Sequence, residues 1–126
     1  MAARWPLAGL AKAAAMPLSA YQGAIRQAGD DCAEVMELLS EATVAYPEDP
    51  DLLNNFAWFL LTVGDERFRH PDAALALARK AVRLTGEKDA NALDTLALAL
   101  FRAGDGAGAV AAQEKAVALD PEDEEY

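Results

Sequence analysis

The side chains that could do chemistry are few in this sequence, and their spacing matches no catalytic or metal-binding motif. The 126 residues include one cysteine, Cys32, and one histidine, His70. One cysteine excludes an internal disulfide, and a structural zinc site needs four Cys or His ligands. Because no Lys, Arg or His is near Cys32 in the sequence, we predict a small, buried or half-buried apolar residue rather than a reactive thiol. His70 directly precedes Pro71, which suits the start of a helix better than a general base.

Two further segments have compositions that could bind phosphate or cations. Residues 104–108 have the sequence Gly-Asp-Gly-Ala-Gly, but a dinucleotide-binding loop must follow a β-strand, and these residues join two predicted helices. Residues 120–125 carry five carboxylates, which we interpret as a solvated end rather than a metal site. The sequence therefore predicts no enzyme activity, no cofactor and no metal.

The composition favours helices and excludes several classes of protein. The chain has 30 Ala, 17 Leu and a formal net charge of −10. Ala and Leu are strong helix formers. An acidic chain lacks the cationic surface that nucleic acids require, so we expect no nucleic-acid partner. No uncharged apolar stretch reaches the length of about 18 residues that a membrane span needs, so we expect no membrane contact.

Residues 1–16 are interpreted as a separate N-terminal segment that forms a short amphipathic helix. A cleaved secretory signal is the alternative, because Arg4 precedes an apolar run and residues 13–15 are alanines. Lys12 interrupts that run. We therefore expect a cytoplasmic protein, with the periplasm as the alternative if this segment is a signal or if the chain belongs to an exported protein.

An internal repeat shows which elements must position any site. One set of residues recurs 40 positions later, with Leu53, Phe56, Ala57 and Leu60 matched by Leu93, Leu96, Ala97 and Leu100. The same set is matched 35 positions earlier by Leu18, Tyr21 and Ile25. Between the second helices of the second and third units the spacing falls to 35, as between Ala74 and Ala109, which places a five-residue insertion within residues 66–72 of the second unit. The repeats span residues 17–49, 50–89 and 90–121 of one domain over residues 17–126.

Each repeat is predicted to consist of a helix, a turn and a second helix, because its apolar residues are three and four positions apart. We expect the first helices over residues 17–28, 50–63 and 90–103, and the second helices over 31–46, 71–84 and 106–119. A Gly-Asp pair recurs at residues 29–30, 64–65 and 104–105. Gly can end one helix in the left-handed conformation, and Asp can cap the next helix. Pro47 and Pro121 end two of the second helices.

The pattern resembles the tetratricopeptide repeat of bacterial proteins. The third repeat carries the resemblance most fully, through Leu93, Leu96, Ala97, Leu100, Gly104, Ala109, Gln113, Ala116 and Pro121. The first repeat departs from the pattern at Gln22, where a small residue is expected. The resemblance implies an all-α superhelix of three stacked repeats with the first helices on its inner face. It also implies a non-catalytic scaffold that binds a peptide or a partner helix there. One subtype of the family clamps chaperone C-termini with Lys, Arg and Asn. Asn55 stands at one of these clamp positions, but Ser19, Gly23, Asn91 and Thr95 stand at the others. The cations are therefore missing, and this ligand is not expected.

The partner-binding residues that the resemblance implies lie on the inner face of the second and third repeats. They are Asn54, Trp58, Leu61, Thr62, Asn91, Asp94, Leu98, Phe101 and Arg102. Trp58 and Phe101 are the expected anchors, because aromatic residues commonly dominate binding energy. The alternative is that both rings pack between adjacent first helices. Asn54, Asn91, Asp94 and Arg102 are expected to orient the ligand, although an Asn near a helix start can instead satisfy local backbone groups.

Three other hypotheses remain open at this stage. Val110 and Val117 could be exposed on the last repeat and pair with a second copy of the chain, giving a homodimer. The chain could also be an accessory module of a larger bacterial multidomain enzyme, because residues 84–96 look like a repeat variant common in such proteins. Within the insertion, Phe68 either contacts a partner or packs down to close the longer connection.

Overall fold

The computed structural model describes residues 16–119 and is all-α, as the sequence predicts. Its elements, in chain order, are α2 (Leu18–Ala28), α3 (Cys32–Ala45), α4 (Pro50–Thr62), the short 3₁₀-helix η1 (Glu66–Phe68), α5 (Pro71–Leu84), α6 (Ala90–Arg102) and α7 (Gly106–Leu119). No β-strand occurs within the described residues. The helix predicted within residues 1–16 lies almost entirely outside the described residues.

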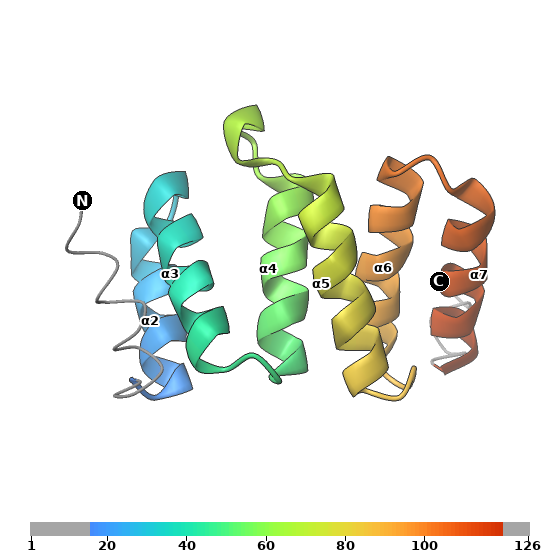
Figure 1. Cartoon of the computed structure of the whole chain (residues 1–126), viewed down its shortest axis with the longest axis horizontal. Coiled ribbons are helices and arrows are strands. Elements are labelled where there is room, and N and C mark those ends of the chain that lie inside the picture. Colours follow the sequence, from blue (N-terminus) through green and yellow to red (C-terminus); the bar gives the residue numbers. More distant parts are fainter. Residues whose placement is uncertain (1–15, 120–126) are drawn as a thin grey trace.

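The helices form three hairpins, α2 with α3, α4 with α5, and α6 with α7, arranged in a row (Figure 1). All six helices begin and end within about one residue of the predicted boundaries. The local signals explain why. The carboxylates of Asp49 and Asp89 accept hydrogen bonds from the backbone N–H groups of Leu52 and Asn91, and thereby cap α4 and α6. Pro71 occupies the first turn of α5, where its missing N–H is not needed.

The recurring Gly-Asp pair acts as predicted at only some of its positions. Gly29 and Gly104 have the positive φ angles expected at a helix end, 56° and 90°, and the Asp105 carboxylate accepts a hydrogen bond from the N–H of Gly108 in α7. The prediction is wrong for Asp30, because Asp31 caps α3. It is also wrong for Gly64, which is not among the glycines with positive φ. There the insertion delays the next helix, so Asp65 caps η1 instead.

The hydrophobic core runs along the row of helices and consists mainly of leucine and alanine. The largest fully buried side chains are those of Tyr21, Leu53, Leu60, Leu61 and Leu93. Alanines fill the positions where two helices approach each other, and Ala57, Ala78 and Ala81 are completely buried. Small side chains at these positions let the helix backbones come close.

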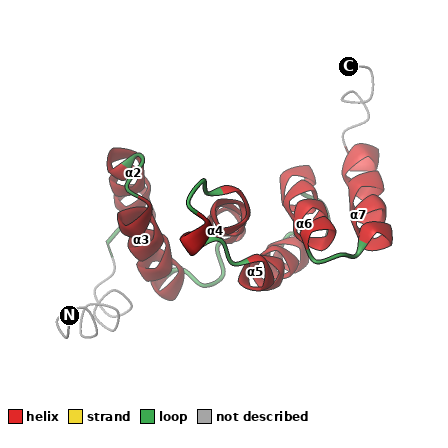
Figure 2. Ribbon diagram, turned by 90° about the horizontal axis from the view of Figure 1, so that it is seen from above, coloured by secondary structure: helices red, strands yellow, loops and turns green. Residues whose placement is uncertain are grey.

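The hairpins are not joined equally closely. Helix α4 packs against both α5 and α6, and α6 also packs against α5 and α7. Helix α2 packs mainly against its own partner α3, which makes a smaller contact with α4 and a further one with η1. Seen from above, α4, α5 and α6 form the centre of the row, with the α2–α3 hairpin at one side (Figure 2). The centre of the core therefore lies in the second and third hairpins.

Candidate functional site

Trp58 and Phe101 are the largest exposed apolar side chains of the described residues, and they line the same hollow. Trp58 is 49% exposed and Phe101 is 67% exposed. The hollow has a volume of about 380 Å³, and Leu98, Val110 and Gln113 also contribute to its wall. Helices α4, α6 and α7 supply these residues. The two rings are therefore not enclosed between the first helices, which was the alternative to the anchor role.

A polar hollow of about 330 Å³ adjoins the apolar one at Trp58, and it is lined by Asn54, Asn55, Asn91, Asp94 and Thr95. The amide oxygen of Asn54 is buried and has no hydrogen-bond partner, although the Asn54 side chain as a whole is only half-buried. Leaving such an acceptor unpaired costs about 1–3 kcal/mol.

A hydrogen bond between α6 and α7 fixes the carboxylate that both hollows share. The side-chain amide of Gln113 donates to Oδ1 of Asp94 over 2.8 Å. This bond leaves the second carboxylate oxygen of Asp94 with acceptor capacity toward a ligand. The sequence prediction assigned only first-helix residues to the site and therefore missed Gln113 and Val110. Helix α7 is apolar on most sides, so its periodicity did not indicate an inner face.

Three of the predicted contact residues are buried or hydrogen-bonded within the protein, namely Leu61, Thr62 and Arg102. Leu61 is 1% exposed, so its prediction as a contact residue is wrong. It lies one turn after Ala57, on the buried side of α4, which is wide because α4 packs against three helices. The hydroxyl of Thr62 donates to the Trp58 carbonyl within the same helix.

Arg102 connects two helices instead of pointing into the hollows. One of its guanidinium nitrogens donates to the backbone carbonyl of Leu61 over 3.0 Å. The last carbonyls of a helix lack intrahelical partners and carry partial negative charge. Arg102 in α6 therefore satisfies and stabilises the C-terminus of α4, and its predicted role in orienting a ligand is not supported by this contact.

Contacts of its own residues hold the insertion between α4 and α5 in place. Phe68 is half-buried, and the Arg67 guanidinium lies 5.7 Å from the centre of its ring. Hydrogen bonds from the Arg67 side chain and backbone lower the pKa of the Asp65 carboxyl below its usual value. Arg69 donates to the carbonyl of Val63 over 2.7 Å. These contacts, together with the packing of η1 against α3, favour the closing role of Phe68.

The remaining reactive residues lie apart from the hollows. Cys32 is half-buried at the start of α3, as expected, but the fold brings Arg67 within electrostatic range of it. His70 precedes the first turn of α5. Among residues 16–119, no three His, Cys, Asp or Glu side chains are grouped so that they could hold a metal ion. The acidic residues 120–125 lie outside the described residues.

Comparisons with known proteins add no assignment. No family model matches the chain, and no curated protein matches it significantly. None of the described helices has both the length and the apolar character needed to cross a membrane.

Proposed function

We propose that this chain is a non-catalytic binding module that captures a peptide or a partner helix in the two adjoining hollows on α4, α6 and α7. The observation that carries the proposal is the exposure of Trp58 and Phe101 around one apolar hollow. Exposed apolar patches on soluble domains commonly mark interaction sites, and aromatic residues are enriched among those that contribute most to binding.

Recognition in this proposal divides into an apolar and a polar part. An apolar side chain of the ligand inserts between Trp58 and Phe101 and covers Leu98 and Val110. The ligand backbone lies along the polar hollow, where Asp94 accepts a hydrogen bond from one of its N–H groups and Asn54 and Asn91 line the wall. Apolar contacts then select the side chain, and polar contacts set the direction of the ligand.

The arrangement of helices supports a tetratricopeptide-like array as the scaffold. Three helix hairpins follow one another at the predicted repeat spacing, and alanines stand where neighbouring helices approach. Each hairpin buries its apolar side only against its neighbours, which is the physical basis of repeat proteins. We propose further that the chain is a bacterial cytoplasmic protein, or a module of a larger one.

The test is a peptide selection followed by affinity measurement. Peptides are selected from a random 12-residue library on the wild-type chain, and their dissociation constants are measured by fluorescence anisotropy for Trp58→Ala, Phe101→Ala and the control Val44→Ala. Val44 is an exposed apolar residue on α3, away from the hollows. We expect each aromatic truncation to weaken binding about 30-fold, as a loss of about 2 kcal/mol implies.

The control variant should bind within about a factor of two of the wild-type chain, and circular dichroism should show all three variants folded, because surface changes seldom exceed about 0.5 kcal/mol in stability. Selected peptides that bind equally well to Trp58→Ala and Phe101→Ala would refute the assignment of the hollows.

Self-association through α7 is a second candidate, because one observation favours it. Val110 is 59% exposed on a helix that is apolar on most sides, although Val117 is half-buried rather than exposed. A second copy that packed on Val110 would cover this surface. Sedimentation equilibrium should then show a dimer that Val110→Glu dissociates, and a monomer at high concentration would remove this candidate.

A further inference from the structure

Asp94 is the one charged residue among the described residues that line the two hollows, and it lines both of them. Its side chain is exposed. The hydrogen bond that it accepts comes from Gln113, whose amide is a neutral donor. Within residues 16–119, Asp94 makes no ion pair. Its negative charge is therefore uncompensated where the apolar hollow and the polar hollow meet.

The helices around Asp94 supply no cation to it. The residues three and four positions away, which share its side of α6, are all uncharged, namely Ala90, Asn91, Ala97 and Leu98. Arg102, two turns farther along α6, donates instead to the carbonyl of Leu61. On α4, Asp51 is exposed and shares a side of the helix with Asn54. It adds a second negative charge near the polar hollow.

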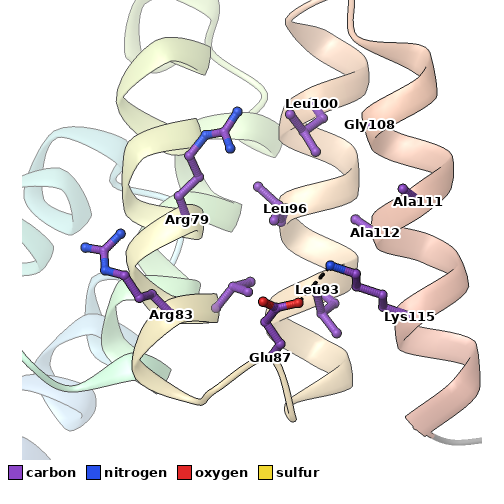
Figure 3. A pocket seen from close by; sticks show the side chains of 11 residues that line it. Arg79, Arg83, Glu87, Leu93, Leu96, Leu100, Gly108, Ala111, Ala112 and Lys115 are labelled. Carbon is purple, nitrogen blue, oxygen red and sulfur yellow. Dashed lines mark hydrogen bonds and ion pairs between the residues drawn. The ribbon is translucent and has the colours of Figure 1, made fainter.

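Three cations of α5 and α7 border a different groove. Arg79, Arg83 and Lys115 line the space between α5, α6 and α7 (Figure 3). The carboxylate of Glu87 in that groove accepts a hydrogen bond from Nζ of Lys115 over 2.7 Å. That groove and the two hollows share no lining residue. Glu87 thus has a cation of the same chain as its partner, whereas Asp94 has none in the described part of the chain.

A ligand that covers the hollows removes water from the Asp94 carboxylate. Gln113 and a backbone N–H of the ligand can both donate to this group, but both are neutral. A carboxylate that loses water without meeting an opposite charge opposes binding, whereas a cation placed beside it offsets that cost. The ligand that fits these hollows best therefore brings a positive charge to Asp94.

We propose, building on the peptide-binding function above, that the ligand carries a lysine or arginine whose cation pairs with Oδ2 of Asp94 and lies against the ring of Trp58. Trp58 and Asp94 are the two residues that line both hollows. An indole ring attracts a cation that lies over its face. The aliphatic stem of the basic side chain covers Leu98 in the apolar hollow.

The positions of Asp94 and the apolar wall along α6 set the spacing within the ligand. Asp94 precedes Leu98 by four residues and Phe101 by seven, which corresponds to about 6 Å and about 10 Å along the helix axis. Side chains on one side of an extended peptide recur about every 6.8 Å. We therefore expect the basic residue two positions from the inserted apolar residue in an extended ligand, and three or four positions from it in a helix.

The test uses the 12-residue peptides selected on the wild-type chain. Each peptide whose binding is weakened by Trp58→Ala is made in two further versions, with its basic residue replaced by norleucine or by glutamate. Norleucine keeps an aliphatic chain but carries no charge. Fluorescence anisotropy then gives dissociation constants for the wild-type chain, Asp94→Asn and the control Glu34→Gln. Asp94→Asn removes the charge but keeps an oxygen for Gln113, and Glu34 is exposed on α3 and lines neither hollow.

We expect Asp94→Asn to weaken the original peptides about 5-fold, which is the upper range for an exposed ion pair. The norleucine versions should bind Asp94→Asn and the wild-type chain equally well. Glu34→Gln removes the same charge from the chain and should leave every affinity within about a factor of two. The effect of Asp94→Asn should shrink in about 1 M NaCl, where the screening length falls to about 3 Å. Asp94→Lys should reverse the preference and bind the glutamate versions more tightly than the originals.

Selected peptides that depend on Trp58 but contain no Lys or Arg would overturn this proposal and leave the peptide-binding function standing. Equal weakening of the original and norleucine versions by Asp94→Asn would also overturn it, because Asp94 would then act without a cation. Equal effects of Glu34→Gln and Asp94→Asn would show that the net charge of −10 attracts the peptides. If no selected peptide depended on Trp58 or Phe101, the peptide-binding function would fail as well.

Discussion

Ala57 illustrates at the residue scale how side-chain size holds the hairpins together. It is completely buried, and it lies on α4, the helix that packs against α3, α5 and α6. A methyl group fills this position, and protein interiors have little free volume to accept a larger one. The identity of Ala57 thus sets how close the neighbouring helices can lie.

We expect Ala57→Leu to lower the free energy of unfolding by about 1–3 kcal/mol, because the added carbons would force the helices apart. Urea denaturation followed by circular dichroism measures the change. Ala76→Leu, on an exposed position of α5, is the matched control and should change stability by less than about 0.5 kcal/mol. Equal effects of the two substitutions would show that close helix approach at Ala57 is not required.

Ionisation of Tyr21 in the first hairpin should make the stability of the chain depend on pH. Its ring is buried and makes an edge-on contact with Tyr46 at 6.3 Å between centroids. Burial, and then the nearby Glu41 and Tyr46, raise the pKa of the Tyr21 hydroxyl above its ordinary value of 10.0. The folded chain therefore keeps this proton to a higher pH than the unfolded chain does.

Because the folded state binds more protons in this window, the free energy of unfolding should fall as the pH rises above about 10 toward the raised pKa. Tyr21→Phe cannot ionise, so its stability should fall less steeply over the same range. Urea titrations at several alkaline pH values, for the wild-type chain and the variant, measure both slopes. Identical slopes would mean that Tyr21 does not titrate differently in the two states.

At the scale of an element, α7 begins with a cap that depends on a glycine. The Asp105 carboxylate accepts the N–H of Gly108 over 2.8 Å. A Cβ atom added at Gly108 would lie 2.5 Å from this carboxylate, whereas a Cβ at Gly106 would have no other atom within 4 Å. Of the two glycines in the first turn of α7, Gly106 therefore has room for a larger side chain, whereas Gly108 does not.

Gly106→Ala should raise the free energy of unfolding by about 0.4–1 kcal/mol, because it restricts the unfolded chain without a clash. Gly108→Ala restricts the unfolded chain as well, but it displaces the Asp105 cap, which is worth about 1 kcal/mol. Its net gain should be near zero or negative. Thermal unfolding of the two variants beside the wild-type chain makes the comparison, and the same gain for both would argue against the cap.

At the scale of the whole molecule, the unequal contacts between hairpins imply unequal local stability. The first hairpin buries four residues, Tyr21, Val35, Leu39 and Ala42, whereas α6 alone buries seven. In arrays of helix hairpins, each unit is stabilised mainly by its neighbours. The unit with the smaller contact should open first.

Hydrogen exchange should therefore be faster in α2 and α3 than in α4, α5 and α6 under native conditions. Exchange followed by mass spectrometry resolves the helices, and the opening free energy of the first hairpin should be below that of global unfolding. Uniform exchange in all six helices would instead show that the array unfolds as one cooperative unit.

Much of the local structure could be predicted from the sequence, because its causes are local. The spacing of Leu53, Phe56 and Leu60 specifies a helix with one apolar face, and Pro71 specifies where α5 begins. The all-α class and all six helix boundaries follow from such patterns. The helical period places Trp58 and Phe101 off the apolar face of their helices, but only the structure shows that neighbouring helices leave both rings exposed.

Only the tertiary structure decided which residues line the two hollows. Helical periodicity states which residues share a face, but not how many neighbours cover that face. Leu61 is buried because α4 has three packing partners, and Arg102 is engaged because the end of α4 lies beside it. Gln113 meets Asp94, and Lys115 meets Glu87, across distances that depend on the crossing of α6 and α7. Such contacts depend on packing between helices that are distant in sequence, and no single helix encodes them.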